Sequence, residues 1–206
     1  MNNDQTTTIL LISILALSFL DFGTRKKDES SAMVDPALFI IRGSHEYISS
    51  PDEMRRLLIK YEGYRNCRYL DTKGIPTIGI GYNLNANVGT TKKLVGTNWP
   101  ICLSDQNINK LYRFSIARAT SELDARLTWA RTMPSRVRDV LIRSSFNMGM
   151  GNESSGLLSF GNTLNLLKNR RFVEAARGFR MSKWCRDVKE TRCHFETKII
   201  EGAANG

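Results

Sequence analysis

A chain of 206 residues is long enough to bury one sizeable core, or two lobes that share a helix. Its hydrophobic content of 41% and charged content of 24% are ordinary for a globular protein, but its formal net charge of +10 is not. A basic surface favours polyanions, yet these charges are scattered and no groove-reading or base-reading motif accompanies them. An anionic membrane and an acidic cell-wall polymer are the other polyanions that such a charge favours. We expect an anionic cell-wall surface as a partner, and no specific nucleic acid.

The N-terminal segment contains an apolar run over residues 9–20. This run is too short for a comfortable membrane-spanning helix, which needs roughly 20 residues. It suits the hydrophobic part of a secretory signal, although no Lys or Arg precedes it. We predict a signal peptide over residues 1–23 and a secreted, extracellular protein, with a membrane anchor through residues 9–22 as the alternative. Residues 24–49 are predicted to form a linker or pro-segment, and residues 50–206 the functional domain.

A helix is predicted to begin after Ser50 and to end at Gly63. Serine is a favoured N-cap, Pro51 suits the first turn, and Glu53 stands three residues past the cap. Glycine is a natural C-terminal stop. Glu62 is therefore expected in the last turn, beside unsatisfied carbonyl groups and the negative end of the helix dipole. That setting suits a carboxylic acid that donates a proton.

A β-hairpin is predicted directly after this helix. Residues 65–70 have the pattern of a strand, and Asp71 begins a polar turn that includes Gly74. Asp71 follows Glu62 by nine residues, in wetter surroundings. Glycosidic bond cleavage requires two carboxyl groups in different environments, because one protonates the leaving oxygen while the other handles water or the sugar cation. Most pairs at this spacing are solvated surface charges, so spacing alone does not establish a catalytic site.

The hairpin is predicted to continue into a strand that runs through Gly79 and Gly81. These glycines alternate with Ile78 and Ile80, so one face of the strand would be bulky and the other bare. A bare face lets a backbone or a sugar approach closely. Residues 83–100 are rich in Asn, Gly and Thr and are predicted to be loop-rich.

Helices are predicted for most of the remaining chain. Ser104 caps a long helix whose apolar and small residues recur at helical spacing, namely Ile108, Leu111, Tyr112, Ile116, Ala119 and Leu123. Pro134 begins another helix that ends at Gly149. Further helices are expected over residues 163–169, 172–181 and 191–201. Phe160 and Trp184 are expected to belong to the core rather than to form platforms for sugars.

Four cysteines, Cys67, Cys102, Cys185 and Cys193, follow the secretory leader, which favours two disulfides over free thiols. Four thiols allow three pairings, among which the sequence alone does not choose. Cys185 and Cys193 flank a predicted reversal of the chain, so we predict the pairs 185–193 and 67–102. Zinc is disfavoured because the chain has no CxxC pair.

The hairpin residues resemble the active-site hairpin of the phage-type lysozymes (glycoside hydrolase family 24). That hairpin reads Glu-Gly-x-x-x-x-x-Tyr-x-Asp-Thr-x-Gly-x-x-Thr-Ile-Gly-Ile-Gly. The chain has the same residues at the same spacing: Glu62, Gly63, Tyr69, Asp71, Thr72, Gly74, Thr77, Ile78, Gly79, Ile80 and Gly81. Later matches follow in order at residues 146–149, 160–164 and 182–184. The resemblance thus covers nearly the whole chain beyond residue 50.

This resemblance implies an α+β, lysozyme-like fold, in which a long helix joins a small N-terminal lobe with a β-hairpin sheet to an all-helical C-terminal lobe. It implies a muramidase that hydrolyses, with inversion, the β-1,4 bond between N-acetylmuramic acid and N-acetylglucosamine in bacterial peptidoglycan. Glu62 would be the general acid, and Asp71 and Thr77 would position the attacking water. No cofactor or metal is expected. We expect a monomer that acts in antibacterial defence or bacterial cell lysis; the alternative is a cationic wall- or membrane-binding protein that has kept the fold without activity.

The same resemblance assigns further residues to the site. Asn83, Phe146 and Thr163 would bind the saccharide, although Asn83 stands where a leucine is usual. Tyr82 replaces the histidine that commonly follows the Gly-Ile-Gly motif and would support the site. Arg192 falls where the family often places an arginine that pairs with the catalytic glutamate.

Overall fold

The computed structural model of the chain describes residues 50–188 and 190–205. The predicted signal peptide (1–23), the alternative anchor (9–22) and the predicted linker or pro-segment (24–49) lie outside the described residues and stay predictions. None of the helices in the described part is long and apolar enough to cross a membrane.

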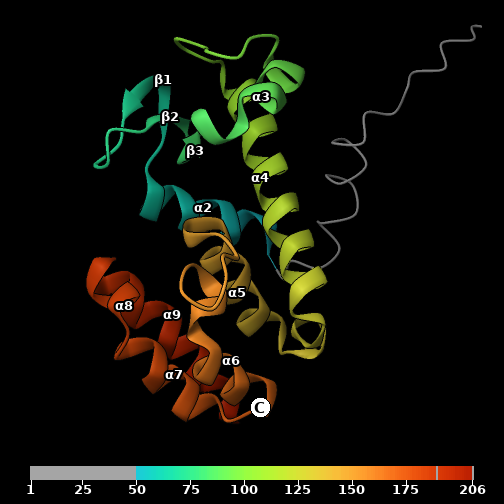
Figure 1. The fold of residues 1–206 in the computed structure, drawn as a ribbon, viewed down its shortest axis with the longest axis vertical. Coiled ribbons are helices and arrows are strands. Elements are labelled where there is room, and N and C mark those ends of the chain that lie inside the picture. Colours follow the sequence, from blue (N-terminus) through green and yellow to red (C-terminus); the bar gives the residue numbers. More distant parts are fainter. Residues whose placement is uncertain (1–49, 189, 206) are drawn as a thin grey trace, which may run out of the picture. The chain divides into compact units, whose positions relative to one another are not determined.

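The predicted fold class is confirmed, with one small antiparallel sheet followed by helices (Figure 1). The sheet has the strand order β1-β2-β3, and α4 contacts its strands as well as α5 of the helical part. The elements are α2 (Pro51–Glu62), β1 (Arg65–Leu70), β2 (Pro76–Gly79), β3 (Tyr82–Asn83), α3 (Val88–Val95), α4 (Asp105–Arg126), α5 (Ser135–Met148), α6 (Gly161–Lys168), α7 (Phe172–Arg180), α8 (Lys183–Asp187) and α9 (Glu190–Gly202).

Helix α2 begins and ends as its local sequence predicts. The Ser50 hydroxyl accepts a hydrogen bond from the Glu53 backbone N–H at 3.3 Å, as an N-cap does. Gly63 follows the last turn with a φ of 83°, a conformation that other residues rarely adopt. The helix buries its apolar face, Met54, Leu57 and Leu58, and leaves Glu62 at its C-terminal end.

The strand predicted through Gly79 and Gly81 is wrong in its extent. Strand β2 ends at Gly79, and Ile80 and Gly81 form the turn to β3. Both glycines have positive φ, 65° and 64°, which suits a tight turn and not a continuing strand. A Cβ at Gly79 would lie 3.1 Å from the Ile108 Cγ2 atom, and one at Gly81 would lie 3.1 Å from the Glu62 Cβ atom. The close approach that the glycines allow is therefore used by two side chains of the protein itself.

The loop-rich segment predicted over residues 83–100 is only partly correct, because it contains a 3₁₀ turn over Asn85–Asn87 and helix α3. Helix α3 ends at Gly96, whose left-handed backbone places its N–H 2.9 Å from the Lys92 carbonyl oxygen. The apolar side chains of this segment pack on a small core under the sheet, made by Ile78, Tyr82, Leu84 and Leu111 with Leu94 and Val95. Local composition favoured a loop, but this packing stabilises a helix.

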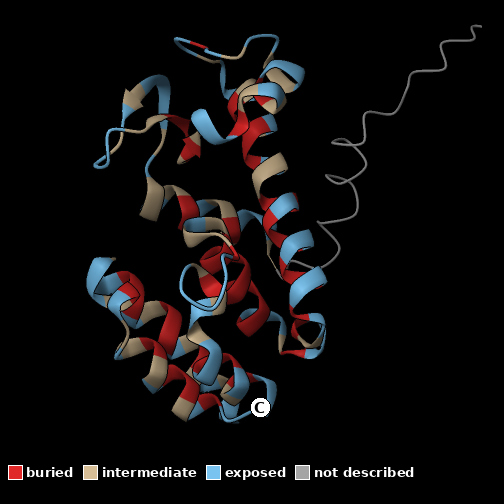
Figure 2. Cartoon of the chain, viewed as in Figure 1, coloured by how far each residue is buried: buried red, intermediate tan, exposed pale blue. Residues whose placement is uncertain are grey.

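Helix α4 connects the small core to the larger core of the helical lobe. Its predicted inward residues are all buried: Ile108, Leu111, Tyr112, Ile116, Ala119 and Leu123. Helix α5, in the centre of the helical lobe, is buried over most of its length (Figure 2). Phe160 and Trp184 pack against Phe179, with ring centroids 5.1 and 6.1 Å away, so both belong to the larger core as predicted.

Candidate active site

The Glu62 carboxyl group is held through one of its two oxygens. Oε1 accepts hydrogen bonds from Arg192 Nη1 in α9 at 2.8 Å and from Asn147 Nδ2 in α5 at 3.2 Å. No group in residues 50–188 or 190–205 is hydrogen-bonded to Oε2. The side chain is 18% exposed, so a substrate can reach it. This arrangement fixes the carboxyl plane and leaves Oε2 open for chemistry.

Arg192 pairs with Glu62, as the resemblance predicted, and it is almost completely buried (4% exposed). Its guanidinium carbon lies 4.7 Å from the centre of the Tyr61 ring, which adds a cation–π contact. Within the described residues, its Nε and Nη2 atoms have no hydrogen-bond partner. Burial, and then the charge of Glu196, raises the pKa of Tyr61, so the ring stays neutral beside the arginine. The position of Arg192 therefore depends on one hydrogen bond, on the contact with Tyr61 and on its backbone.

Asp71 and Thr77 are brought together by the backbone of Ile75. Asp71 Oδ1 accepts hydrogen bonds from the N–H groups of Lys73 and Ile75, each at 2.8 Å. The Thr77 hydroxyl donates to the Ile75 carbonyl oxygen at 2.9 Å. Thr77 is 4% exposed and lies opposite Tyr69 in the β1–β2 ladder. The hairpin turn thus fixes the carboxylate and the hydroxyl in relation to each other.

The other predicted site residues lie on several elements. Asn83 caps the following turn, because its Oδ1 accepts from the Ala86 N–H at 2.9 Å. Tyr82 is buried in the small core, where burial raises its pKa and its hydroxyl lies 3.2 Å from Thr91 Oγ1. It supports the sheet and forms no hydrogen bond with Glu62.

Phe146 and Thr163 come from the helical lobe. Phe146 lies in the last turns of α5, is partly buried and packs against the larger core. Thr163 lies in α6 and is 8% exposed. A Cβ at Gly178 would lie 2.5 Å from Thr163 Oγ1, so the glycine in α7 allows the two helices to approach closely at this point. These contacts fix both side chains by packing within the helical lobe.

Two residues in contact with the site were missed by sequence reasoning. Asn147 donates to Glu62, and its Oδ1 accepts from the Trp184 indole N–H at 3.3 Å. Asn147 lies inside the stretch 146–149 that matches the family, but within this stretch the resemblance assigned a site role only to Phe146. The ring of Trp184 belongs to the core as predicted, but its indole N–H also donates a hydrogen bond to Asn147, which the sequence did not indicate. No local pattern marks an amide that bridges two helices.

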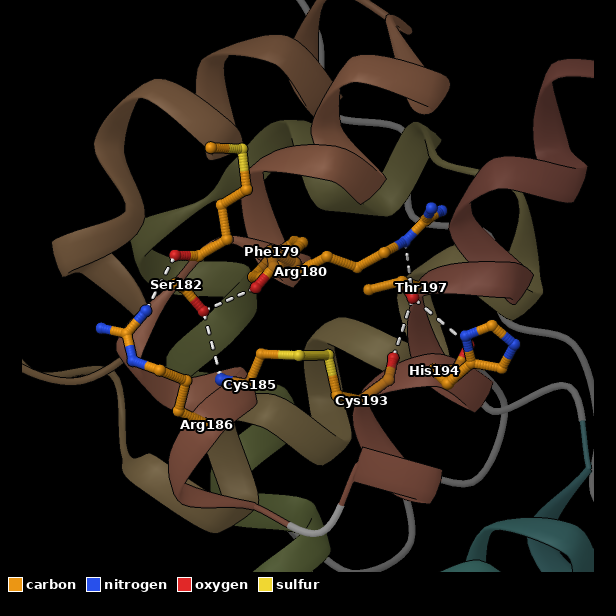
Figure 3. The surroundings of a disulfide bond; sticks show 9 residues. Phe179, Arg180, Ser182, Cys185, Arg186, Cys193, His194 and Thr197 are labelled. Atoms are coloured by element: carbon orange, nitrogen blue, oxygen red, sulfur yellow. Dashed lines mark hydrogen bonds between the residues drawn. A yellow bond between two sulfur atoms is a disulfide. The ribbon is translucent and has the colours of Figure 1, made fainter.

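Both predicted disulfides are present, Cys67–Cys102 and Cys185–Cys193. The first ties β1 to the segment before α4, and the second ties α8 to α9 (Figure 3). In the part of the chain that the structure describes, no group of His, Cys, Asp and Glu side chains could hold a metal ion.

Comparison with known proteins identifies the family of the chain. The sequence model of the family described as phage lysozyme matches residues 59–193, more than half of the chain. The chain belongs to the phage lysozyme family. It is therefore a glycoside hydrolase with lysozyme activity, and family membership implies peptidoglycan as its substrate. It is also similar to a protein of Dictyostelium discoideum described as probable T4-type lysozyme 1, with 26% identity over 144 residues, 62% of this chain and 82% of that protein.

Proposed function

We propose that this lysozyme is a muramidase in which Glu62 is the general acid of an inverting hydrolysis. The bond cleaved is the β-1,4 linkage between N-acetylmuramic acid and N-acetylglucosamine. The observation that carries the proposal is the difference between the two Glu62 oxygens. Oε1 must remain an acceptor for the N–H groups of Arg192 and Asn147, so the proton of the acid is placed on Oε2. Oε2 then protonates the leaving oxygen.

Asp71 and Thr77 are proposed to hold the attacking water. The Thr77 proton is engaged by the Ile75 carbonyl, so its oxygen is left to accept a hydrogen bond from water. Asp71 Oδ1 is engaged by two backbone N–H groups, which leaves Oδ2 as the oxygen that accepts the other water proton. A water that donates to both residues directs its lone pair at the anomeric carbon. Inverting glycosidases keep their carboxyl groups far enough apart to admit this water.

The remaining proposals concern binding and biological role. We propose that Asn83, Phe146 and Thr163 contact the saccharide, with Tyr82 supporting the strand that carries Asn83. The two disulfides support a protein that is secreted, since such bonds persist in oxidising compartments. The formal charge of +10 supports a role at anionic bacterial surfaces, in antibacterial defence or bacterial cell lysis. The charge does not distinguish this role from the alternative, a cationic wall- or membrane-binding protein without activity; loss of lysis in Glu62→Gln would argue against that alternative.

The stereochemistry of the product tests the mechanism. Inversion at a β-linked sugar releases the α-anomer, because water attacks from the face opposite the leaving oxygen. Soluble peptidoglycan fragments would be mixed with the protein, and the anomeric protons followed by NMR before the sugar equilibrates. We expect the α signal to appear first. Initial release of the β-anomer would show a retaining reaction and contradict the water-positioning role.

Thr77 offers a test of water positioning by itself. Thr77→Val replaces the hydroxyl by a methyl group of similar size and should lower kcat roughly tenfold or more, because one hydrogen bond to the water is lost. Thr77→Ser is the matched control, since it keeps the hydroxyl and loses only a methyl group. Both variants would be assayed on soluble fragments. Equal rates for the valine and serine variants would mean that the hydroxyl does not act on water.

The rate of wall lysis should depend steeply on salt. Exposed charges act over about 10 Å at 0.1 M ionic strength and are screened beyond that distance. The clearing rate of bacterial walls would be measured at low and high salt, with walls that carry or lack anionic polymers. We expect salt to slow clearing mainly for the anionic walls. If salt slowed the clearing of both kinds of wall equally, the anionic polymer would not be the partner of the basic surface.

A further inference from the structure

The Cys185–Cys193 disulfide lies one residue from each of two hydrogen-bonding arms that reach Glu62. In the first arm, Arg192, directly before Cys193, donates to Glu62 Oε1 at 2.8 Å. In the second arm, the indole N–H of Trp184, directly before Cys185, donates to Asn147, which donates in turn to the same oxygen. The two half-cystines thus belong to the backbone that carries both arms.

The second arm needs Trp184 to keep the Asn147 amide in one orientation. Asn147 Oδ1 accepts from the indole at 3.3 Å while its Nδ2 donates to Glu62 Oε1 at 3.2 Å. An amide that rotates by half a turn exchanges its oxygen and its nitrogen. The amide oxygen would then face the carboxyl oxygen, and the hydrogen bond to Glu62 would be lost. The indole N–H prevents this rotation because it requires an acceptor.

Both arms start from chain segments that are weakly fixed by themselves. Helix α8 has only five residues, too few to be stable alone. Arg192 lies in the first turn of α9, where the backbone N–H groups have no partners within the helix. Cys193 is 1% exposed, so its end of the disulfide is packed in the core. Figure 3 shows the disulfide joining the two helices, with Ser182 Oγ accepting from the Cys185 N–H at 3.3 Å.

We propose that the Cys185–Cys193 disulfide is a positioning element of the active site, which holds Arg192 and Trp184 at the spacing that fixes Glu62 Oε1. This inference rests on the proposed role of Glu62 as the general acid. Without the bridge, α8 and the first turn of α9 separate more freely, and both donors are displaced from the carboxyl group. Oε2 then points at the leaving oxygen for a smaller fraction of the time. The bridge closes a loop of only 8 residues, against 35 for Cys67–Cys102, so chain entropy predicts the smaller effect on stability.

The test compares two variants of the full chain. Cys185→Ala/Cys193→Ala removes the bridge, and kcat on soluble peptidoglycan fragments should fall about tenfold or more with KM unchanged, because the acid is misplaced after binding. The matched control is Arg180→Ala. It removes hydrogen bonds from α7 to Thr197 and Glu201 of α9 but touches neither arm. It should lower the melting temperature and leave kcat as in the wild type.

A spectroscopic measurement separates positioning from a general loss of stability. The indole N–H signal of Trp184 would be assigned in a ¹H–¹⁵N NMR spectrum by its loss in Trp184→Phe. It should shift when the bridge is removed and stay in place in Arg180→Ala. Should the cysteine variant fail to fold, the folded wild type would be treated with dithiothreitol and iodoacetamide. The fraction of molecules in which only the Cys185–Cys193 disulfide is reduced and alkylated would be measured. We expect kcat to fall in proportion to that fraction.

Wild-type kcat in the bridge-free protein, or an unmoved indole signal, would overturn the inference. Glu62→Gln, measured alongside, distinguishes this failure from that of the proposed function. If the glutamine variant is inactive and the bridge-free protein is fully active, Glu62 remains the acid and only the positioning role falls. If the glutamine variant is active, the proposed function falls and the positioning role falls with it.

Discussion

Replacement of Glu62 by glutamine should abolish wall lysis while the protein stays folded. Glutamine keeps an oxygen that accepts the hydrogen bonds of Arg192 and Asn147, so the shape and contacts of the site persist. Its amide group replaces the open Oε2 and cannot supply a proton to the leaving oxygen. General acid catalysis contributes about two to four orders of magnitude, and the clearing of a bacterial wall suspension should slow by that amount.

Glu53→Gln is the matched control for this substitution. Glu53 belongs to the same helix, at the opposite end, and lies 3.5 Å from Arg136 in an exposed ion pair. Loss of such a pair has a small effect on stability and none on the proposed chemistry. Circular dichroism should show both variants folded. Clearing by Glu62→Gln at the rate of Glu53→Gln would remove Glu62 from the mechanism.

The largest effect on stability should come from breaking the buried ion pair between Arg143 in α5 and Glu196 in α9. Two hydrogen bonds of 2.8 and 2.6 Å join them, and their side chains are 3% and 2% exposed. Arg143→Met leaves Glu196 as an unpaired buried charge and should lower the free energy of unfolding by about 3 to 5 kcal/mol. Urea denaturation followed by circular dichroism would measure this change.

Two further variants show whether the loss of stability in Arg143→Met comes from the unpaired charge of Glu196. Arg143→Met/Glu196→Leu replaces both partners by apolar groups and should recover most of the loss. Arg171→Met breaks an exposed pair with Glu174, of 2.8 Å, and should change the free energy of unfolding by less than about 1 kcal/mol. A loss no larger in Arg143→Met than in Arg171→Met would show that the buried pair is not a major source of stability.

The start and end of α2 and the start of α4 were predictable because their determinants are local. Ser50 and Ser104 bond to N–H groups three residues ahead, and Gly63 adopts a φ that few residues tolerate. The β1 strand and the polar turn at Asp71 were predictable for the same reason. Both disulfide pairs were also correct, because one spans a short reversal of the chain and the other then follows by elimination.

Helix α3 could not be predicted from its residues, because Asn, Gly and Thr dominate its neighbourhood. Leu94 and Val95 pack against an apolar surface that forms only when β2, β3 and α4 come together. The end of β2 was missed for a similar reason. Gly79 and Gly81 fit a strand with a bare face as well as a turn, and only the nearby side chains of Ile108 and Glu62 distinguish the two.

The sequence by itself determined the family, the fold class, the helix end that carries Glu62 and the hairpin that carries Asp71 and Thr77, because short-range spacing specifies them. The tertiary structure alone decided which oxygen of Glu62 is held. Its donors, Asn147 and Arg192, stand 85 and 130 residues away in the chain. The sequence resemblance supplied the second donor and not the first. An amide hydrogen bond across two helices leaves no local pattern, since it arises only when α2, α5, α8 and α9 pack together.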